Sequence, residues 1–345
     1  MSRIAIVGSG SWGTALALSL ARRGDHTIAL WSHSAGVAET IRKQRENAAY
    51  LPGFPIPPQV TPTTDLAAAV AGADIVISAV PSQHVREIYQ AMAPLLQPQQ
   101  LLVSATKGIE DQTFLRMTQV IEQVLGEQIF WEQVLNSCRS GPPCGVLSGP
   151  SFAQEVATGA PTAITIACAE SRLANQLQEE LSAPGLRLYT NDDVIGVEMG
   201  GALKNVIAIA AGIASGLGLG HNSAAAIITR GIAEITRLAV ACGGRRETLA
   251  GLSGLGDLVL TCTGPLSRNR SVGVELGKGH RLPTILAELH GKVAEGVRTT
   301  SAALGLARAH EVEMPITEQM SAILEHGKSP QDAIRELMAR PGRDE

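Results

Sequence analysis

Short aliphatic runs alternate with longer segments of helical period through the first half of the chain. Apolar runs at 4–7, 27–31, 73–80 and 101–107 have the length and residue types of strands. The run at 73–80 is almost continuously apolar, which is typical of a parallel strand covered on both faces. This alternation of strand and helix predicts a doubly wound α/β sheet.

The pattern changes at Asn191. Strand-like segments at 144–147, 162–168 and 186–190 precede this residue, and a proline-dense stretch at 51–58 is predicted to be an extended loop. After Asn191, apolar residues recur at helical spacing in segments at 195–216, 223–241, just after 257, 268–276, 284–290, 299–310, 316–325 and 330–340. The sequence therefore predicts an α/β domain over residues 1–190 and an all-helical domain over residues 191–345.

Three glycines follow the first predicted strand and open a helix. Gly8, Gly10 and Gly13 form a G-x-G-x-x-G pattern. Gly8 would allow the tight turn, Gly10 would leave room for a pyrophosphate against the backbone, and Gly13 would let the helix pack closely on the strand. The pattern predicts a dinucleotide site, and the alternative is a turn that is glycine-rich for packing alone.

The residues after the second strand bear on which dinucleotide is bound. NAD-binding folds usually place Asp or Glu here, where the carboxylate holds the ribose 2′-hydroxyl. This chain has Ser32, His33 and Ser34 instead, so nothing repels a 2′-phosphate, and Ser32 and His33 could donate to one. NADP is favoured locally, unless this is a solvated loop and the cofactor choice is made elsewhere. The basic residues at 42–45 are interpreted as a solvated helix face.

Ligands of doubly wound sheets lie outside the carboxyl ends of the strands. The residues predicted at those ends are Ser11, Trp12, Ser32, His33, Pro81, Ser82 and Lys107. Lys107 directly follows an apolar strand, so it could reach a phosphate or a carbonyl oxygen, and the alternative is an exposed loop lysine. Ser151 is predicted to cap the next helix, with Gln154 in the capping-box position.

Composition and charge narrow the class of protein. A chain of 345 residues can form two domains, and its net charge of −4 gives no support to nucleic-acid binding. The five cysteines form no C-x-x-C pair, which argues against a disulfide framework or a metal site and for a reducing cytoplasm. No signal peptide is predicted, because the chain enters a strand almost at once. The apolar run at 206–219 is too short to span a membrane and is expected to be a buried helix.

Charged residues in apolar or glycine-rich surroundings mark the second half. Lys204 interrupts a helix that otherwise looks buried, and a buried lysine can serve as a general acid or base. Asp257 could orient it. Arg268 and Asn269 stand at a helix start, where they could hold a phosphate. The alternatives are a lysine that reaches water, an N-cap aspartate and a solvated basic turn. Glu295 is a weaker candidate.

The order of these motifs closely resembles the bacterial-type NAD(P)-dependent sn-glycerol-3-phosphate dehydrogenases. The resemblance runs through GSGSWGTALA, ATKG, SGPSFAQE, GGALKNVIAIAAG, ITRG, GLGDLVLTCT, SRNR, VAEG and EMPIT. It implies a Rossmann-like domain followed by a helical substrate domain, and reversible reduction of dihydroxyacetone phosphate by NADPH or NADH to sn-glycerol 3-phosphate. It also implies a homodimer whose product enters glycerophospholipid synthesis.

The resemblance also implies residue roles. Lys204 matches the proton donor and acceptor, and Lys107 matches a lysine that contacts substrate and cofactor; with Asp257 they are the predicted catalytic residues. Further substrate positions are Gly149, Ser151, Asp257, Ser267, Arg268 and Asn269. Cofactor positions beyond the three glycines are Ser11, Trp12, His33, Lys107, Ala153, Arg268, Val293 and Glu295.

One segment departs from the family pattern. Residues 130–145 are longer than expected and are interpreted as a surface insertion. Two other functions remain as alternatives. One is an NADP-dependent β-hydroxyacid dehydrogenase, which would need a carboxylate site in place of SRNR. The other is a catalytically silent NADPH-binding sensor, which would not need to retain Lys204 with Lys107.

Overall fold

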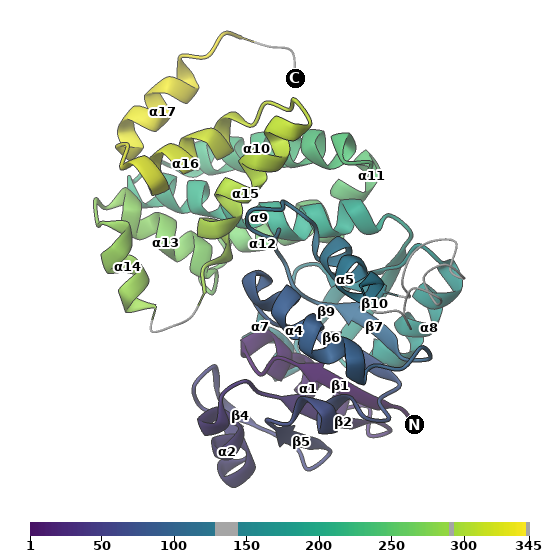
Figure 1. Cartoon of the computed structure of the whole chain (residues 1–345). Helices are drawn as coiled ribbons and strands as arrows, with labels where there is room; N and C mark the ends of the chain where they lie inside the picture. The colour runs from purple at the N-terminus through teal and green to yellow at the C-terminus, as the bar shows by residue number, and fades with distance from the viewer. Residues whose placement is uncertain (128–143, 290–292, 343–345) are drawn as a thin grey trace. The chain divides into compact units, whose positions relative to one another are not determined.

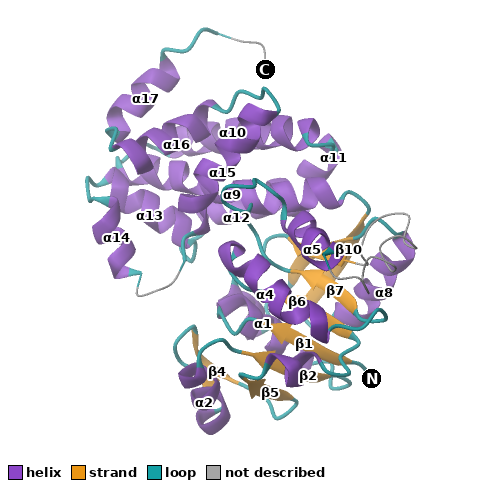
Figure 2. Cartoon of the chain, viewed as in Figure 1, coloured by secondary structure: helices purple, strands orange, loops and turns teal. Residues whose placement is uncertain are grey.

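The computed structural model describes residues 1–127, 144–289 and 293–342 (Figure 1). All the described strands lie before residue 192, and the described chain after it is helical (Figure 2). This confirms the predicted fold class, an α/β domain followed by an all-α domain. The segment at 130–145 lies outside the described residues up to 143.

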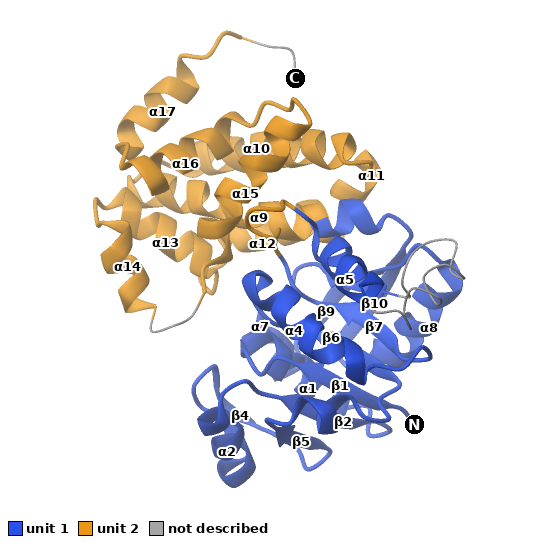
Figure 3. Cartoon of the chain, viewed as in Figure 1, with its two compact units in different colours: residues 1–107, 115–198 blue, residues 108–114, 199–345 orange. Residues whose placement is uncertain are grey.

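Two compact units divide the chain, residues 1–107 with 115–198 and residues 108–114 with 199–345 (Figure 3). The chain passes from the first unit to the second between residues 198 and 199, inside helix α9 (Val194–Gly216). The predicted boundary at 190/191 lies a few residues before this point. Glu198 explains why the first turn of α9 stays with the α/β unit. Its carboxylate pairs with Arg116 and accepts from the backbone N–H of Thr118 at 2.8 Å.

The short segment at 108–114 belongs to the helical unit. A Cβ atom added at Gly305, in helix α15 (Glu295–Ala309), would overlap the ring of Phe114. Arg298 of the same helix lies 3.5 Å from Asp111. The absence of a side chain at Gly305 thus lets this segment pack directly on α15.

The α/β unit is built on one sheet. Its order is β10-β9-β8-β7-β6-β1-β2-β5. The strands are β1 (Arg3–Val7), β2 (Thr27–Trp31), β5 (Val60–Thr63), β6 (Ile75–Ser78), β7 (Leu101–Ser104), β8 (Cys144–Ser148), β9 (Thr162–Ala167) and β10 (Leu186–Asn191). Neighbours pair in parallel except β8 with β9, so the six strands from β8 to β5 end at the same edge.

Helices cover both faces of this sheet. They are α1 (Ser11–Ala21), α2 (Ala35–Gln44), α3 (Leu66–Val70), α4 (Val85–Met92), α5 (Met117–Gly126), α7 (Ala153–Thr158) and α8 (Ser171–Leu181). Ile4 and Ile6 of β1 pack in a core with α1, while Ala5 and Val7 pack in a second core with Tyr89 of α4. Alternate residues thus enter opposite cores, as expected for parallel strands buried on both sides.

The stretch at 51–58 is not the loop that was predicted. Strand β4 (Leu51–Pro55) pairs antiparallel with β3 (Glu46–Asn47) in a separate two-stranded sheet. Prolines are tolerated there because a two-stranded sheet leaves one side of each strand unpaired. Arg45 is likewise not part of a solvated face. Its guanidinium donates to the carbonyls of Ile56 and Val60 at 2.9 and 3.0 Å.

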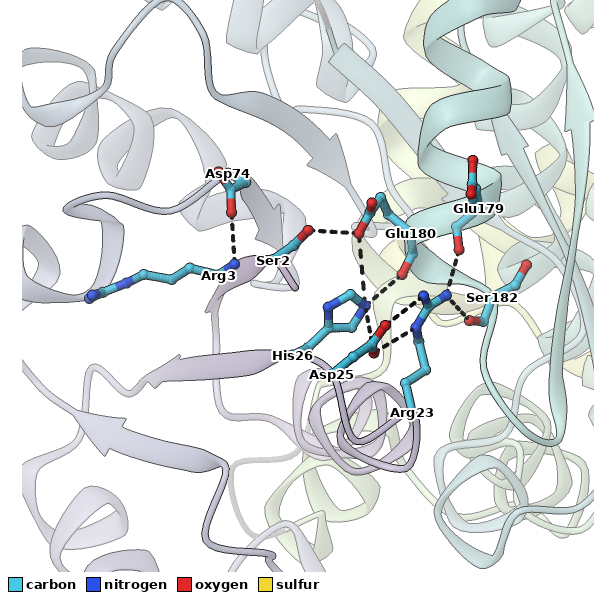
Figure 4. Close-up of polar contacts among 9 residues, drawn as sticks. All are labelled: Ser2, Arg3, Arg23, Asp25, His26, Asp74, Glu179, Glu180 and Ser182. Atoms are coloured by element: carbon cyan, nitrogen blue, oxygen red, sulfur yellow. Dashed lines mark hydrogen bonds and ion pairs between the residues drawn. The ribbon is translucent and has the colours of Figure 1, made fainter.

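A polar cluster joins the amino ends of the strands to the end of α8 (Figure 4). His26 is buried, and its Nε2 lies 2.9 Å from the carbonyl oxygen of Glu180. A carbonyl only accepts, so Nε2 of His26 carries a proton. Arg23 pairs with Asp25 and donates to the carbonyl of Ser182 at 2.8 Å. Its guanidinium lowers the pKa of Asp25 to about 2.

The helical unit is organised around α9. Its other helices are α10 (His221–Ala241), α11 (Arg246–Leu249), α12 (Asp257–Thr263), α13 (Arg268–Gly277), α14 (Leu282–Glu288), α15, α16 (Pro315–His326) and α17 (Pro330–Met338). Helix α9 has the length and mean hydropathy, 1.5, of a membrane span, but 89% of that window is buried inside the protein. Such burial is typical of a core helix, as predicted for residues 206–219, but α9 ends at Gly216 and Leu219 is 39% exposed.

Glycines bring α9 and α13 into backbone contact. A Cβ added at Gly212 would lie 2.9 Å from Cα of Gly273, and one at Gly216 would lie 3.0 Å from Cα of Gly277. The spacing of four residues on each helix places these glycines on one face. The close approach packs the second half of α13 against the last turns of α9.

A buried carboxylate on α10 caps α16. Glu234 is 1% exposed, and it accepts from the backbone N–H of Ile316 at 2.5 Å and from the N–H and hydroxyl of Thr317 at 3.3 and 3.1 Å. These donors favour the charged form, whereas burial disfavours it. Burial has the larger effect and raises the pKa of Glu234 to about 7.

This raised pKa predicts a pH-dependent stability. The folded pKa lies above the ordinary value of 4.5, so the contribution is fully present below pH 4.5 and is lost as the pH rises through 7. We expect the Glu234→Gln variant to lose less free energy of unfolding between pH 5 and 8 than the unmodified protein, by about 3 kcal/mol. Urea unfolding of both proteins across this range measures the difference, and parallel pH profiles would contradict the assignment.

Candidate active site

The glycine-rich loop after β1 has two glycines that packing requires and one that it does not. Gly8 has φ +123°, and a Cβ there would lie 2.6 Å from the carbonyl oxygen of Ala79. A Cβ at Gly13 would overlap the carbonyl oxygen of Gly8. At Gly10, in contrast, φ is −67° and a Cβ would meet no protein atom within 4 Å. The space beside Gly10 therefore suits a ligand that approaches the backbone.

The start of α1 has the donors that a pyrophosphate needs. Gly10 is the N-cap residue of this helix, and no side chain caps it within the described residues. The indole N–H of Trp12 is buried and has no acceptor in the described part of the chain. The first backbone N–H groups of a helix and the positive end of its dipole fit a dinucleotide at this position.

The exit of β2 differs in one respect from the expectation. The hydroxyl of Ser32 donates to the carbonyl of Ser34 at 3.1 Å, so it is used within the loop rather than facing a phosphate. Ser34 itself caps α2 by accepting from the N–H of Val37. His33 is exposed, with its ring edge-on to that of Trp31 at 6.2 Å. At the exit of β6, Ser82 is buried in a short 3₁₀ turn.

Lys107 meets the residues that follow β8, because β7 and β8 are neighbours in the sheet. Its Nζ donates to the carbonyl of Gly149 at 2.8 Å and lies 3.4 Å from Oγ of Ser151. Ser151 is not the helix cap that was predicted, because α7 begins after Phe152 and the Ser151 hydroxyl donates to Gly149 at 2.9 Å. Ala153 is the first residue of that helix.

In the helical unit, Lys204 is 7% exposed within the apolar length of α9. Its Nζ lies 3.0 Å from Oδ1 of Asp257 and donates to Oγ1 of Thr261 at 2.7 Å. The Thr261 hydroxyl donates in turn to the backbone carbonyl of Asp257 at 2.6 Å. Asp257 is the first residue of α12 rather than its cap, and it is 1% exposed. A buried ammonium thus stands between a carboxylate and a hydroxyl.

Thr261 was not predicted from the sequence. It lies four residues after Asp257 on the same helix, so both side chains project from one face. That spacing is the one signal that could have identified it. A Cβ at Gly200 would lie 2.5 Å from the carbonyl of Ser253, so α9 packs directly on the short π-helix (Leu252–Gly256) that leads into Asp257.

Three separate motifs meet beside Lys204. Asn269 donates from Nδ2 to Oδ1 of Asn205 at 2.9 Å and accepts from the N–H of Gly296 at 3.0 Å. A Cβ at Gly296 would lie 2.5 Å from the carbonyl of Asn205. This contact joins the GGALKN, SRNR and VAEG segments within one unit, which their distance along the sequence did not reveal.

The ends of α13 and α15 complete this group. Ser267 is buried and caps α13 by accepting from the N–H of Arg270 at 3.2 Å. Arg268 is the exposed first residue of α13. Glu295 is the first residue of α15, and Val293 precedes it, half-buried. The start of α13 thus carries a guanidinium at the positive end of a helix, an arrangement suited to a phosphate.

The three buried cysteines do not contribute to this chemistry. Burial raises the pKa of Cys168 and of Cys262 to about 12 and raises that of Cys144 as well. Thiols with such pKa values are unreactive at neutral pH. Cys138 lies outside the described residues.

Comparison with known proteins decides the family. Residues 3–174 match the family model for the N-terminus of NAD-dependent glycerol-3-phosphate dehydrogenase. Residues 193–335 match the family model for the C-terminus of the same enzyme. The chain belongs to the NAD-dependent glycerol-3-phosphate dehydrogenase family. This confirms the resemblance that the motifs indicated and the use of NAD(P) as cofactor.

Full-length relatives support the same assignment to the glycerol-3-phosphate dehydrogenase family. The chain is 63% identical to glycerol-3-phosphate dehydrogenase [NAD(P)+] of Acidobacterium capsulatum, with 100% of both chains covered. It is 48% identical to the Geobacter sulfurreducens protein of that name, over 98% of this chain and 97% of that one. A crystal structure of glycerol-3-phosphate dehydrogenase from Coxiella burnetii has TM-score 0.90 and 41% identity, covering 98% of this chain and 99% of that one.

Proposed function

We propose that this chain reversibly reduces dihydroxyacetone phosphate to sn-glycerol 3-phosphate with NADPH or NADH. The observation that carries the proposal is the buried group of Lys204, Asp257 and Thr261, with Nζ of Lys204 at 3.0 and 2.7 Å from its two partners. Its position in a helical unit matched by the dehydrogenase family supports the assignment.

The residues around Lys204 account for the proton. The nicotinamide, when bound, supplies or takes the hydride. In the direction of reduction, Nζ of Lys204 gives a proton to the carbonyl oxygen of the ketone, which becomes the C2 hydroxyl, and the amine regains a proton from water. Asp257 and Thr261 orient Nζ, and the positive charge stabilises the oxygen while it becomes negative.

Other residues bind the substrate phosphate and carbon skeleton. We assign the phosphate chiefly to Arg268 and Asn269 at the start of α13, together with Ser267, which caps this helix. When the phosphate is held in place, the carbonyl group of the substrate is held in position as well. Binding energy from the phosphate, which does not react, thus helps to orient the carbon that does. The further substrate positions are Lys107, Gly149, Ser151, Lys204 and Asp257.

The cofactor is assigned chiefly to the glycine-rich loop. Its proposed contacts are Gly8, Gly10, Ser11, Trp12, Gly13, His33, Lys107, Ala153, Arg268, Val293 and Glu295. Exposed His33 is proposed to read a 2′-phosphate when NADP is bound. We further propose that the enzyme works as a cytoplasmic homodimer and supplies glycerophospholipid synthesis.

The proposed reaction can be tested by substrate choice. We expect fast oxidation of NADPH or NADH at 340 nm with dihydroxyacetone phosphate, and turnover at least about 100-fold slower with unphosphorylated dihydroxyacetone, because the phosphate contacts are lost. The ratio of the NADPH and NADH rates, measured also for His33→Ala, tests the role of His33. Turnover of 3-hydroxy acids instead would favour the β-hydroxyacid dehydrogenase alternative.

A further inference from the structure

A buried asparagine outside the glycine-rich loop is hydrogen-bonded both to the loop and to the helix that follows it. Asn47 of β3 is 1% exposed, and its Nδ2 donates to the carbonyl of Ser9 and to Oγ1 of Thr14, both at 2.8 Å. Ser9 lies inside the loop, and Thr14 lies in the first turn of α1. One side-chain amide thus ties the loop to the helix that it opens.

Tyr50 adds a second connection from the same segment. Its backbone N–H donates to Oδ1 of Asn47 at 3.3 Å, and its carbonyl accepts from the hydroxyl of Ser11 at 2.7 Å. Residues 47–50, here called the loop brace, therefore contact the glycine-rich loop at Ser9 and Ser11 and the following helical turn at Thr14. The Thr14 hydroxyl also lies 3.3 Å from the carbonyl of Ser9.

The loop brace is itself held to the sheet. The guanidinium of Arg45 donates to three carbonyls between residues 56 and 60, just before and at the start of β5. The N–H of Ile56 donates back to the carbonyl of Arg45 at 2.7 Å, and β3 pairs with β4. Because β5 is part of the main sheet, these bonds connect the brace to that sheet.

A glycine-rich loop needs such support in order to bind an anion well. Gly8 and Gly10 give its backbone many accessible conformations, and binding must then pay the entropy of ordering it. Donors fixed beforehand avoid that loss, which raises affinity without any new contact to the ligand. The bonds from Asn47 to Ser9 and Thr14 limit the conformations available to the residues between them.

We propose that Asn47 is a positioning residue of the dinucleotide site, and that the loop brace sets the affinity for NAD(P)H by fixing the glycine-rich loop. The inference rests on the proposed placement of the cofactor at this loop. It is separate from the reaction itself, because Asn47 acts through Ser9 and Thr14.

The chain offers a matched control. Gln100 is 2% exposed, its Nε2 donates to the carbonyls of Val70 and Ala73 at 2.7 and 2.9 Å, and its Oε1 accepts from the N–H of Gln97 at 2.8 Å. It immediately precedes β7, so it lies at the amino edge of the sheet, opposite the glycine-rich loop. Asn47→Asp and Gln100→Glu each keep the side-chain shape, remove two donors and add one buried carboxylate.

The test is a fluorescence titration with NADPH, combined with thermal unfolding and steady-state kinetics. We expect Asn47→Asp to raise Kd and KM for NADPH about tenfold, with kcat and the KM for dihydroxyacetone phosphate changed less than about twofold. Gln100→Glu is expected to lower Tm comparably but to leave Kd for NADPH unchanged. Thr14→Val, which removes one hydroxyl at constant shape, should raise Kd about threefold.

Each other outcome has a defined meaning. Equal Kd changes in Asn47→Asp and Gln100→Glu, or unchanged affinity in Asn47→Asp, would overturn the proposal. If Asn47→Asp does not fold, Thr14→Val decides, and wild-type affinity in that variant overturns it. Gly10→Val separates this inference from the placement of the cofactor. If that variant binds NADPH normally the placement is wrong, whereas if it alone loses binding, only the role of the brace is wrong.

Discussion

Replacing Lys204 with methionine is expected to lower kcat by about 1,000-fold while NADPH still binds. Methionine fills a similar volume in the apolar surroundings of α9 but carries no proton. The proposed proton donor to the carbonyl oxygen is then lost, together with the positive charge that stabilises the developing oxyanion. Stopped-flow and steady-state measurements at 340 nm, with NADPH titrated separately, give both quantities.

This variant also removes the partner of a buried carboxylate. Asp257 is 1% exposed, and a buried charge without its partner destabilises a protein by about 3–5 kcal/mol. The double variant Lys204→Met/Asp257→Asn removes that charge, so we expect it to recover much of the thermal stability and none of the turnover. Recovery of turnover along with stability, or kcat within tenfold of wild type in Lys204→Met, would contradict a role for Lys204 in proton transfer.

The parts of this molecule that could be predicted from sequence are those with local causes. The alternation of short apolar runs with helical segments identified the sheet of the α/β unit, and the change at Asn191 identified the helical one. The dinucleotide site could be predicted from Gly8, Gly10 and Gly13. A tight turn, a ligand close to the backbone and a closely packed helix each require glycine at a fixed spacing. Lys204 was recognisable because a charge within an apolar helix is costly.

The parts that were missed depend on contacts between distant segments. Asn205, Asn269 and Gly296 meet only because α9, α13 and α15 pack together. Ser151 has an ordinary capping pattern, but its hydroxyl donates to the carbonyl of Gly149 and lies beside Lys107, which follows the neighbouring strand β7. No local rule distinguishes such a serine from a cap.

Asn47 and Arg45 show the same limit in the segment after α2. The basic residues at 42–45 have the spacing of a solvated face, and Arg42 and Lys43 are indeed exposed and paired with Glu39. Arg45 differs because carbonyls at 56–60 lie within reach of its guanidinium. The prolines at 52 and 55 concealed the hairpin that places these carbonyls, since proline usually argues against a strand.

The contrast between Gly10 and Gly13 gives the strongest test of where the cofactor binds. Gly10→Val places a side chain in space that no protein atom occupies, at a backbone conformation that valine adopts readily. We expect the unfolding free energy to change by less than about 0.5 kcal/mol. Kd for NADPH should rise at least about 100-fold, because the side chain occupies the place of the pyrophosphate.

Gly13→Ala should behave in the opposite way, although it adds only one carbon. Its Cβ would overlap the carbonyl oxygen of Gly8, so α1 must move away from β1, at a cost of about 3 kcal/mol or more. Thermal unfolding without ligand, together with NADPH titration, separates the two variants, because one loses affinity at constant Tm and the other loses Tm. A stable Gly10→Val variant with normal affinity would mean that Gly10 has no ligand beside it, and the cofactor assignment would have to leave this loop.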